Sequence, residues 1–247
     1  MEIKGNAFFV TGGGSGLGLA VVEEILELGG FALAFDKMEP TVQHPNCINF
    51  AGDVLSDGDI QTAIGKISAR APLRGLVNCA GIGLLDKTVR TRGVHDMDIF
   101  LKQIQVNLVG TFNASRHVAK AMCDGDIVSE ERGVIVHVAS IAAFDGQVGQ
   151  VGYSASKAGV VGMTLPMARD LSEHAIRVVA IAPGPFETPM LTKLPSKRLK
   201  ELESQIPFPG RVGRPKEFSN LVMSVFANKM LNGCVIRLDG GIRMSMK

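Results

Sequence analysis

The glycine-rich segment at residues 11–18 constrains the fold of this chain more than any other feature. It reads TGGGSGLG, follows an apolar run at 6–11 and precedes an amphipathic stretch that begins near Ser15. Glycines permit a tight turn and let the backbone approach a pyrophosphate, while the N-terminus of the next helix offers free N–H groups and a positive dipole end. The segment therefore predicts a dinucleotide-binding turn between a strand and a helix, with these contact residues: Gly12, Ser15, Gly16, Leu17 and Gly18.

Short apolar runs and longer amphipathic stretches alternate along the rest of the chain. They predict strands at 6–11, 31–36, 47–50, 73–78, 133–139, 176–182 and 233–238, and helices near 16–29, 57–70, 97–122, 153–173 and 215–228. Right-handed crossovers between such units give a parallel sheet that is covered on both faces. We expect an α/β fold, a single-domain (1–247) Rossmann-like doubly wound parallel sheet of about seven strands with helices on both faces.

Two segments interrupt the alternation. Residues 83–96 are polar and loop-like, and residues 183–210 contain six prolines. Loops of this length in a compact domain are usually functional. We expect a substrate lid around 185–210, with one or two short helices inside 186–205.

Charge and cysteine usage exclude several classes of partner. The net charge is only +2 and is dispersed, so neither nucleic acid nor a membrane surface is an expected partner. No apolar run approaches the roughly 18 residues of a membrane span, and strand-like sequence begins too early for a leader peptide. The four cysteines are far apart and lack metal-ligand spacing, which is typical of reduced thiols without a metal site. A cytoplasmic location is therefore expected.

Asp36 bears on the choice of dinucleotide. It ends the second predicted strand, where a carboxylate can accept both ribose hydroxyls of the adenosine half and would repel a 2′-phosphate. Ser15 stands where a basic residue would help to hold that phosphate. These residues predict NAD, although Lys37 could supply a counter-charge for NADP.

Tyr153 is the only tyrosine in the chain, and Lys157 follows it by one helical turn. Ser140 comes directly after the buried strand 133–139, at the carboxyl edge of the sheet, where ligands of such sheets bind. A nearby ammonium favours the phenolate, and an acid/base works best with a pKa near the working pH. We expect Tyr153 to exchange a proton with a hydroxyl or keto oxygen that Ser140 holds. An ordinary helix pair is the alternative, which the glycine segment disfavours.

These residues resemble the short-chain dehydrogenase/reductase family along nearly the whole chain. The matches are TGGGSGLG at 11–18, Asp36, Asp53-Val54, Asn78-Cys-Ala-Gly81, Asn107, Ser140, YSASK at 153–157, and Pro183-Gly184 with Thr188. One position departs from the family pattern, because Cys79 stands where a second asparagine is common. A small side chain there should not disturb function.

The resemblance implies roles for the matching residues. Asn107 would bend its helix and hold a water that relays protons to Lys157, and Tyr153 and Lys157 would also contact the nicotinamide ribose side of the cofactor. The further cofactor contacts implied are Asp53 and Val54 at the adenine, Asn78, Ala80 and Gly81 beside the adenosine ribose, and Pro183, Gly184, Phe186 and Thr188 at the carboxamide and pyrophosphate.

Blocks at 145–150, 162–171, 208–213 and 231–240 resemble more narrowly the branch of this family that acts on 3-hydroxyacyl-CoA thioesters. That implies an NAD-dependent enzyme of fatty acid metabolism with an acyl-CoA-type substrate and, as is common in the family, a homotetramer. The candidate substrate wall consists of Gln147, Gln150, Phe186, Met190, Leu191 and Leu194, unless these residues only pack the lid shut.

Three other functions remain open. A 3-oxoacyl-carrier-protein reductase would share the same catalytic residues but usually uses NADPH, which Asp36 disfavours. A hydroxysteroid or secondary-alcohol dehydrogenase is the next alternative. A catalytically silent dinucleotide-binding scaffold is disfavoured because Asn107, Ser140, Tyr153 and Lys157 are all present.

Overall fold

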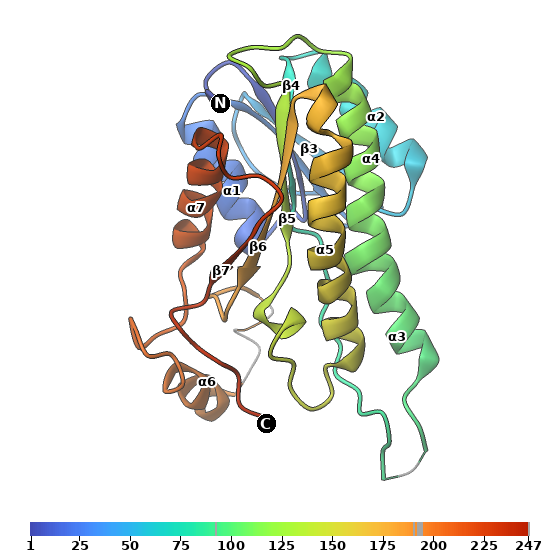
Figure 1. The fold of residues 1–247 in the computed structure, drawn as a ribbon, viewed down its shortest axis with the longest axis vertical. Helices are drawn as coiled ribbons and strands as arrows, with labels where there is room; N and C mark the ends of the chain where they lie inside the picture. The colour runs from blue at the N-terminus through green and yellow to red at the C-terminus, as the bar shows by residue number, and fades with distance from the viewer. Residues whose placement is uncertain (92, 190, 192–194, 247) are drawn as a thin grey trace.

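One parallel β-sheet forms the centre of the fold (Figure 1). The computed structural model describes residues 1–91, 93–189, 191 and 195–246. In these residues the sheet comprises β1 (Ala7–Thr11), β2 (Phe31–Asp36), β3 (Cys47–Ala51), β4 (Leu73–Asn78), β5 (Gly133–Val138), β6 (Ile176–Pro183) and β7 (Val235–Leu238). The strand order is β3-β2-β1-β4-β5-β6-β7, and all neighbouring pairs are parallel. The predicted fold class is confirmed.

The helices lie close to their predicted positions. They are α1 (Gly16–Glu27), α2 (Asp57–Ser68), α3 (Met97–Gln103), α4 (Gly110–Cys123), α5 (Val151–Asp170), α6 (Ser196–Glu203) and α7 (Pro215–Ala227), with short helical turns η2 (Ile141–Ala143) and η3 (Ser172–His174). The single helix predicted at 97–122 is wrong in one respect, because a π-helical segment, η1 (Ile104–Val109), separates α3 from α4. There the N–H of Gly110 donates to the carbonyl of Gln105, five residues back. A π-helical turn contains one residue more than an α-helical turn, and the spacing of apolar residues in the sequence does not reveal it.

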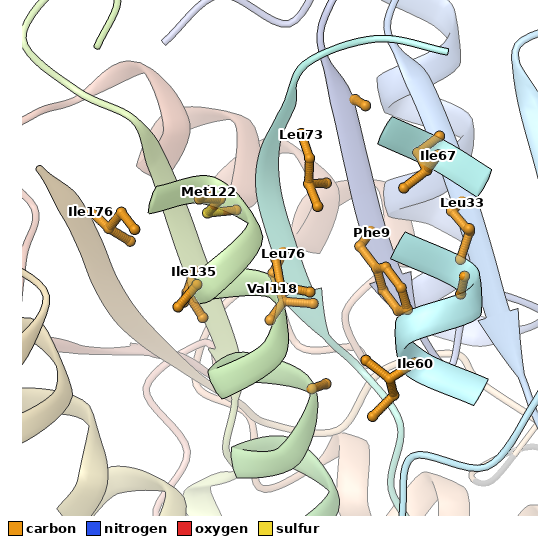
Figure 2. Packing of buried hydrophobic residues seen from close by; sticks show 14 of the residues in the cluster. Phe9, Leu33, Ile60, Ile67, Leu73, Leu76, Val118, Met122, Ile135 and Ile176 are labelled. Atoms are coloured by element: carbon orange, nitrogen blue, oxygen red, sulfur yellow. The ribbon is translucent and has the colours of Figure 1, made fainter. Parts of the chain in front are cut away.

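The sheet buries apolar side chains on both faces because successive strand residues point to opposite sides. Phe8 and Val10 face the layer of α1 and α7, whereas Phe9 faces the layer that contains α2, α4 and α5. Figure 2 shows the second layer, where Ile60 of α2 and Val118 of α4 pack with residues of the strands. Nearly continuous apolar strands are what a sheet covered on both faces requires.

The strand order reverses between β1 and β4, which are neighbours at the centre of the sheet. The strands that follow β1 in sequence lie toward one edge, and those that follow β4 lie toward the other. At such a point the connections that follow the two strands diverge and open a crevice outside their carboxyl ends. The glycine segment follows β1 and residues 79–81 follow β4. Both candidate cofactor segments therefore lie at this reversal.

The predicted lid contains α6 in its described part. Leu199 and Leu202 of α6 pack against a cluster of buried residues that includes Ile206 and Ile141, and Ile141 directly follows Ser140. The described part of the lid region therefore shares one apolar cluster with the segment after β5. Among the described residues, no helix is long and apolar enough to cross a membrane.

Candidate active site

The glycine segment forms a closely packed turn at the carboxyl end of β1. Gly12 has a φ of +66°, and a Cβ there would stand 2.7 Å from the main-chain nitrogen of Ala80. A Cβ on Gly18 would overlap the carbonyl oxygen of Gly12. Helix α1 begins at Gly16 with Ser15 as its N-cap residue, as predicted. Backbone thus lines this turn next to a helix N-terminus, an arrangement that suits a pyrophosphate.

Asp36 lies against the same turn. Its carboxylate accepts from the main-chain N–H of Gly14 at 3.1 Å and of Lys37 at 2.7 Å. The ammonium of Lys37 lies 2.7 Å from a carboxylate oxygen of Asp53. This hydrogen bond lowers the pKa of Asp53 and raises that of Lys37. Lys37, the cation next to Asp36 that could favour NADP, is therefore already paired with a carboxylate.

Side-chain hydrogen bonds fix the end of β4 and the segment that follows it. The hydroxyl of Thr11 accepts from the N–H of Ala80 at 3.2 Å, and the Asn78 amide donates to Ser115 of α4 at 2.9 Å. The side chain of Asn78 thus points toward α4, and any contact with the cofactor would come from its backbone. A Cβ on Gly81 would stand 3.3 Å from the side-chain oxygen of Asn107 and 3.4 Å from the Lys157 ammonium, so this glycine lies close to both side chains.

Ser140, Tyr153 and Lys157 meet where β5 passes into η2 and α5. The Ser140 hydroxyl accepts from the N–H of Ala142 at 3.1 Å, which fixes the turn after β5. The Lys157 ammonium donates to the carbonyl of Val138 at 2.7 Å and lies 5.9 Å from the centroid of the Tyr153 ring. Helical spacing of four residues brings the tyrosine and the lysine to one face, as expected.

Burial shapes the acid/base properties of this group. Desolvation raises the pKa of Tyr153, and the hydrogen bond with Ser140 opposes that shift. Desolvation also lowers the pKa of Lys157 to about 8. The pKa of Tyr153 is raised overall because loss of hydration outweighs the hydrogen bond with Ser140. At neutral pH Tyr153 therefore keeps its proton, and stabilisation of its phenolate by Lys157 stays a prediction.

Asn107 occupies the π-helical segment and is fully buried. Its side chain exchanges two hydrogen bonds with the main chain of Ile82, at 2.8 and 2.9 Å, and donates to Ser156 at 3.0 Å. Asn107 thereby links the chain after β4 to α5. The π-helical turn agrees with the helix irregularity that the family resemblance implied, whereas the water relay stays a prediction.

Gln103 is a site residue that the sequence did not reveal. It is fully buried one helical turn before Asn107, and its side-chain oxygen accepts from the N–H of Leu84 at 3.0 Å. A Cβ on Gly152, next to Tyr153, would stand 2.6 Å from the Gln103 amide nitrogen. The spacing of two amides by four residues was the signal that could have found it.

The remaining cofactor candidates cluster at the same edge with one exception. Thr188 lies over the glycine turn, because a Cβ on Gly16 would stand 3.3 Å from its methyl group. Pro183 ends β6, and the N–H of Gly184 donates to the carbonyl of Leu238 in β7. The Val54 carbonyl accepts from Asn113 at 3.0 Å. The exception is Phe186.

The ring of Phe186 is buried in the core rather than in an open site. It is 6% exposed and lies edge-on to Phe218 of α7, with centroids 6.4 Å apart. A Cβ on Gly213 would stand 2.5 Å from it. Its aromatic side chain therefore packs against Phe218 and Gly213. A contact of Phe186 with the cofactor or substrate could come only from its backbone.

The substrate candidates divide into two groups. Gln147 and Gln150 line a pocket of about 460 Å³ at the first turn of α5, where Val151 and Ser154 also line it. Leu191 instead packs against the cluster that contains Ile141. Met190 and Leu194 lie outside the described residues. The described substrate candidates therefore lie in two places, Gln147 and Gln150 at the pocket and Leu191 at the apolar cluster.

His137 has the core position that its strand pattern indicated. It is fully buried, its ring lies 3.2 Å from the Ser115 hydroxyl, and desolvation lowers its pKa to about 3. A histidine that stays neutral in this position packs the interior and does not take part in proton exchange at the site.

The sheet is doubly wound and parallel, and it carries a glycine turn where its strand order reverses. A Ser–Tyr–Lys group lies at the same carboxyl edge, after β5. Together these features define a dinucleotide-dependent oxidoreductase. The family model described as short chain dehydrogenase matches residues 6–199. The chain belongs to this family, whose members use a nicotinamide dinucleotide.

Three relatives define the similarity more closely. The human 3-hydroxyacyl-CoA dehydrogenase type-2 is 46% identical over 253 residues, which cover 98% of this chain and 97% of the relative. A crystal structure of 3-hydroxyacyl-CoA dehydrogenase type-2 from Mycobacterium avium superposes with a TM-score of 0.93 at 34% identity and covers 100% of both chains. A 3-oxoacyl-(acyl-carrier-protein) reductase from Thermotoga maritima is 33% identical, over 98% of this chain and 99% of the relative.

Proposed function

We propose that this protein is an NAD-dependent oxidoreductase that interconverts 3-hydroxyacyl-CoA and 3-oxoacyl-CoA thioesters. The observation that carries the proposal is the assembly of Ser140, Tyr153 and Lys157 at the sheet edge next to the glycine turn. The similarity to 3-hydroxyacyl-CoA dehydrogenases type-2 supports the substrate class.

The chain's own residues perform the proton chemistry. In the reductive direction the neutral phenol of Tyr153 donates its proton to the 3-oxo oxygen while the Ser140 hydroxyl holds that oxygen. In the oxidative direction the phenol oxygen must first be deprotonated, and the nearby Lys157 ammonium stabilises it. A nicotinamide bound in the crevice supplies or accepts the hydride. Asn107 keeps the chain at Ile82 in place beside Lys157.

The preference for NAD rests on Asp36 and on the pairing of Lys37 with Asp53. The unaltered enzyme should show a lower KM for NADH than for NADPH. Asp36→Ala should narrow that difference, since it removes the carboxylate that repels a 2′-phosphate. A preference of the unaltered enzyme for NADPH would refute this part of the proposal.

A 3-oxoacyl-(acyl-carrier-protein) reductase is the second candidate, which the Thermotoga maritima relative favours. The two functions share the reaction and differ in the carrier. The acetoacetyl group should therefore be offered both on CoA and on an acyl-carrier protein, with NADH. We expect a higher kcat/KM with the CoA thioester, and the reverse order would favour the reductase. A panel of longer acyl chains and hydroxysteroids then ranks the remaining substrates.

A homotetramer and a cytoplasmic location complete the proposal. Between α4 and α5 lies a groove of about 390 Å³, lined by Phe112, Met163 and Pro166 among others. Phe112, which lines this groove, is 49% exposed, and burial of such an apolar side chain between subunits is favourable. The four free cysteines fit a reducing compartment. A role in fatty acid metabolism follows from the proposed acyl-CoA substrate.

A further inference from the structure

The pocket at the first turn of α5 lies between two segments of chain that are far apart in sequence. Lys87, Thr88 and Val89 form one wall, and residues 146–151 with Ser154 form the other. The first wall belongs to the segment between β4 and α3, which Figure 1 shows projecting beyond the end of α5. The shape of the pocket therefore depends on what holds this projecting segment.

The segment has little apolar support of its own. Leu85, Val89 and Val94 are between 70% and 73% exposed, so the side chains that would normally fold a loop face outward. Ordering a loop costs conformational entropy at each residue, and polar contacts must offset that cost here.

Asp86 supplies the polar contacts at the centre of the segment. Its side chain is 9% exposed, and one carboxylate oxygen accepts from Arg90 at 2.6 Å and from the N–H of Asp96 at 2.9 Å. The His95 ring nitrogen lies 3.7 Å from the same oxygen. The carboxylate thus joins the beginning of the loop to the N-cap residue of α3.

The main chain of Asp86 connects the two walls of the pocket. Its N–H donates to the carbonyl of Gly149 at 2.9 Å. Gly149 has a φ of +86° and lies between Gln147 and Gln150 on the opposite wall. One residue therefore both folds the first wall and ties it to the second.

We propose that Asp86 is a positioning residue for the substrate, holding Lys87, Thr88 and Val89 as a wall of the pocket at the first turn of α5, and that the part of the substrate remote from Tyr153 extends into this pocket. Asp86 does not touch the reacting atoms. It acts on the part of the substrate that extends away from the 3-oxo carbon, so the inference rests on the proposed function. Loss of Asp86 should weaken thioester binding and leave the chemical step intact.

The test compares two substrates that share the acetoacetyl group. Acetoacetyl-CoA extends beyond the reacting carbons, whereas ethyl acetoacetate does not fill the pocket. With Asp86→Ala we expect KM for acetoacetyl-CoA to rise about tenfold with kcat within about twofold, and both constants for ethyl acetoacetate to stay within about twofold. Asp86→Asn, which keeps an oxygen acceptor, should give a smaller rise. Asp98→Ala removes an exposed acid from the first turn of α3 and should change neither substrate.

A second readout follows the loop itself. Trypsin should cleave Asp86→Ala faster at Lys87 and Arg90 than it cleaves the unaltered enzyme or Asp98→Ala. The inference is overturned if Asp86→Ala leaves KM for acetoacetyl-CoA unchanged, or if both substrates lose activity equally. If the unaltered enzyme reduces ethyl acetoacetate but not acetoacetyl-CoA, the proposed function itself fails. Should Asp86→Ala not fold, the same comparison is made with Asp86→Asn.

Discussion

Lys157 combines a functional position with an unfavourable environment. Its side chain is buried, and desolvation lowers its pKa from 10.5 to about 8. A shift of this size corresponds to about 3 kcal/mol of folding free energy at neutral pH, because the folded state holds the proton less tightly than the unfolded chain. The hydrogen bond to the Val138 carbonyl offsets part of that cost.

Lys157→Met should therefore abolish turnover and raise the free energy of unfolding. Methionine removes the buried charge but leaves the Val138 carbonyl without its donor, a loss of about 1–3 kcal/mol, so a net gain of about 1 kcal/mol is expected at pH 7. Denaturant unfolding of both proteins measures it.

The difference between the two proteins should change with pH in a defined direction. As the pH rises from about 8 toward 10.5, folded Lys157 loses its proton while the unfolded chain keeps it, so the unaltered enzyme gains stability. The advantage of Lys157→Met should shrink over this range. A constant difference between pH 7 and 10 would show that burial of charge is not the cause.

Gly18 tests the glycine turn because a Cβ there would overlap the Gly12 carbonyl. Gly18→Ala should lose NADH binding and about 1–3 kcal/mol of stability, since the turn must move apart. Gly65→Ala is the matched control, because Gly65 is an exposed residue of α2 with open space around it. It should bind NADH normally and gain about 0.5–1 kcal/mol. Fluorescence titration with NADH separates the two variants, and equal affinity would contradict the turn's role.

At the scale of elements, α3, η1 and α4 form the support for the site. Asn107 in the π-helical segment and Gln103 at the end of α3 lie where their side-chain amides hold Ile82 and Leu84. These bonds fix the chain between β4 and the projecting segment before α3. The support is therefore a polar one inside an otherwise apolar layer, which specifies one arrangement of the chain.

Asn107→Ala should release this support. The N–H and carbonyl of Ile82 lose their partner, so we expect a loss of about 1–3 kcal/mol and faster hydrogen exchange at the Ile82 amide. The value of kcat should fall as Lys157 loses a fixed neighbour. Asn220→Ala, at an exposed position of α7, is the control. Unchanged exchange at Ile82 in the Asn107 variant would contradict this account.

Sequence patterns predicted the elements better than the contacts between them. The alternation of apolar runs placed β2 at its observed bounds, and the glycine segment placed the start of α1. Helical periodicity could not show the π-helical turn, because one extra residue in a turn hardly changes the spacing of apolar residues along the sequence. The side chain of Phe186 was misplaced because its partners Gly213 and Phe218 are remote in sequence.

At the scale of the molecule, the two edges of the sheet have different tasks. Cofactor and substrate candidates gather at the carboxyl edge, whereas Arg177 stabilises the region near the start of β6. Arg177 is 7% exposed, pairs with Glu131 at 3.0 Å and donates to four main-chain carbonyls in and after α7. An arginine inside an apolar strand was visible in the sequence, but its partners were not.

The proposed tetramer belongs to this scale. Phe112→Glu places a charge on the apolar face of α4 and α5 and should dissociate the assembly, because a charge buried in an interface is costly. Leu28→Glu, at a similarly exposed position after α1, should leave the mass unchanged. Light scattering measures both, and a monomeric unaltered enzyme would refute the proposed assembly.

The central claim is that Tyr153 carries the proton in an NAD-dependent oxidation and reduction at the 3-position of an acyl-CoA. The most direct test follows NADH absorbance with acetoacetyl-CoA for the unaltered enzyme and for Tyr153→Phe, with NADH affinity measured in parallel. We expect turnover by the unaltered enzyme, and a loss of at least about a thousandfold in Tyr153→Phe with unchanged NADH affinity. Retained turnover in Tyr153→Phe, or none in the unaltered enzyme, would contradict the account.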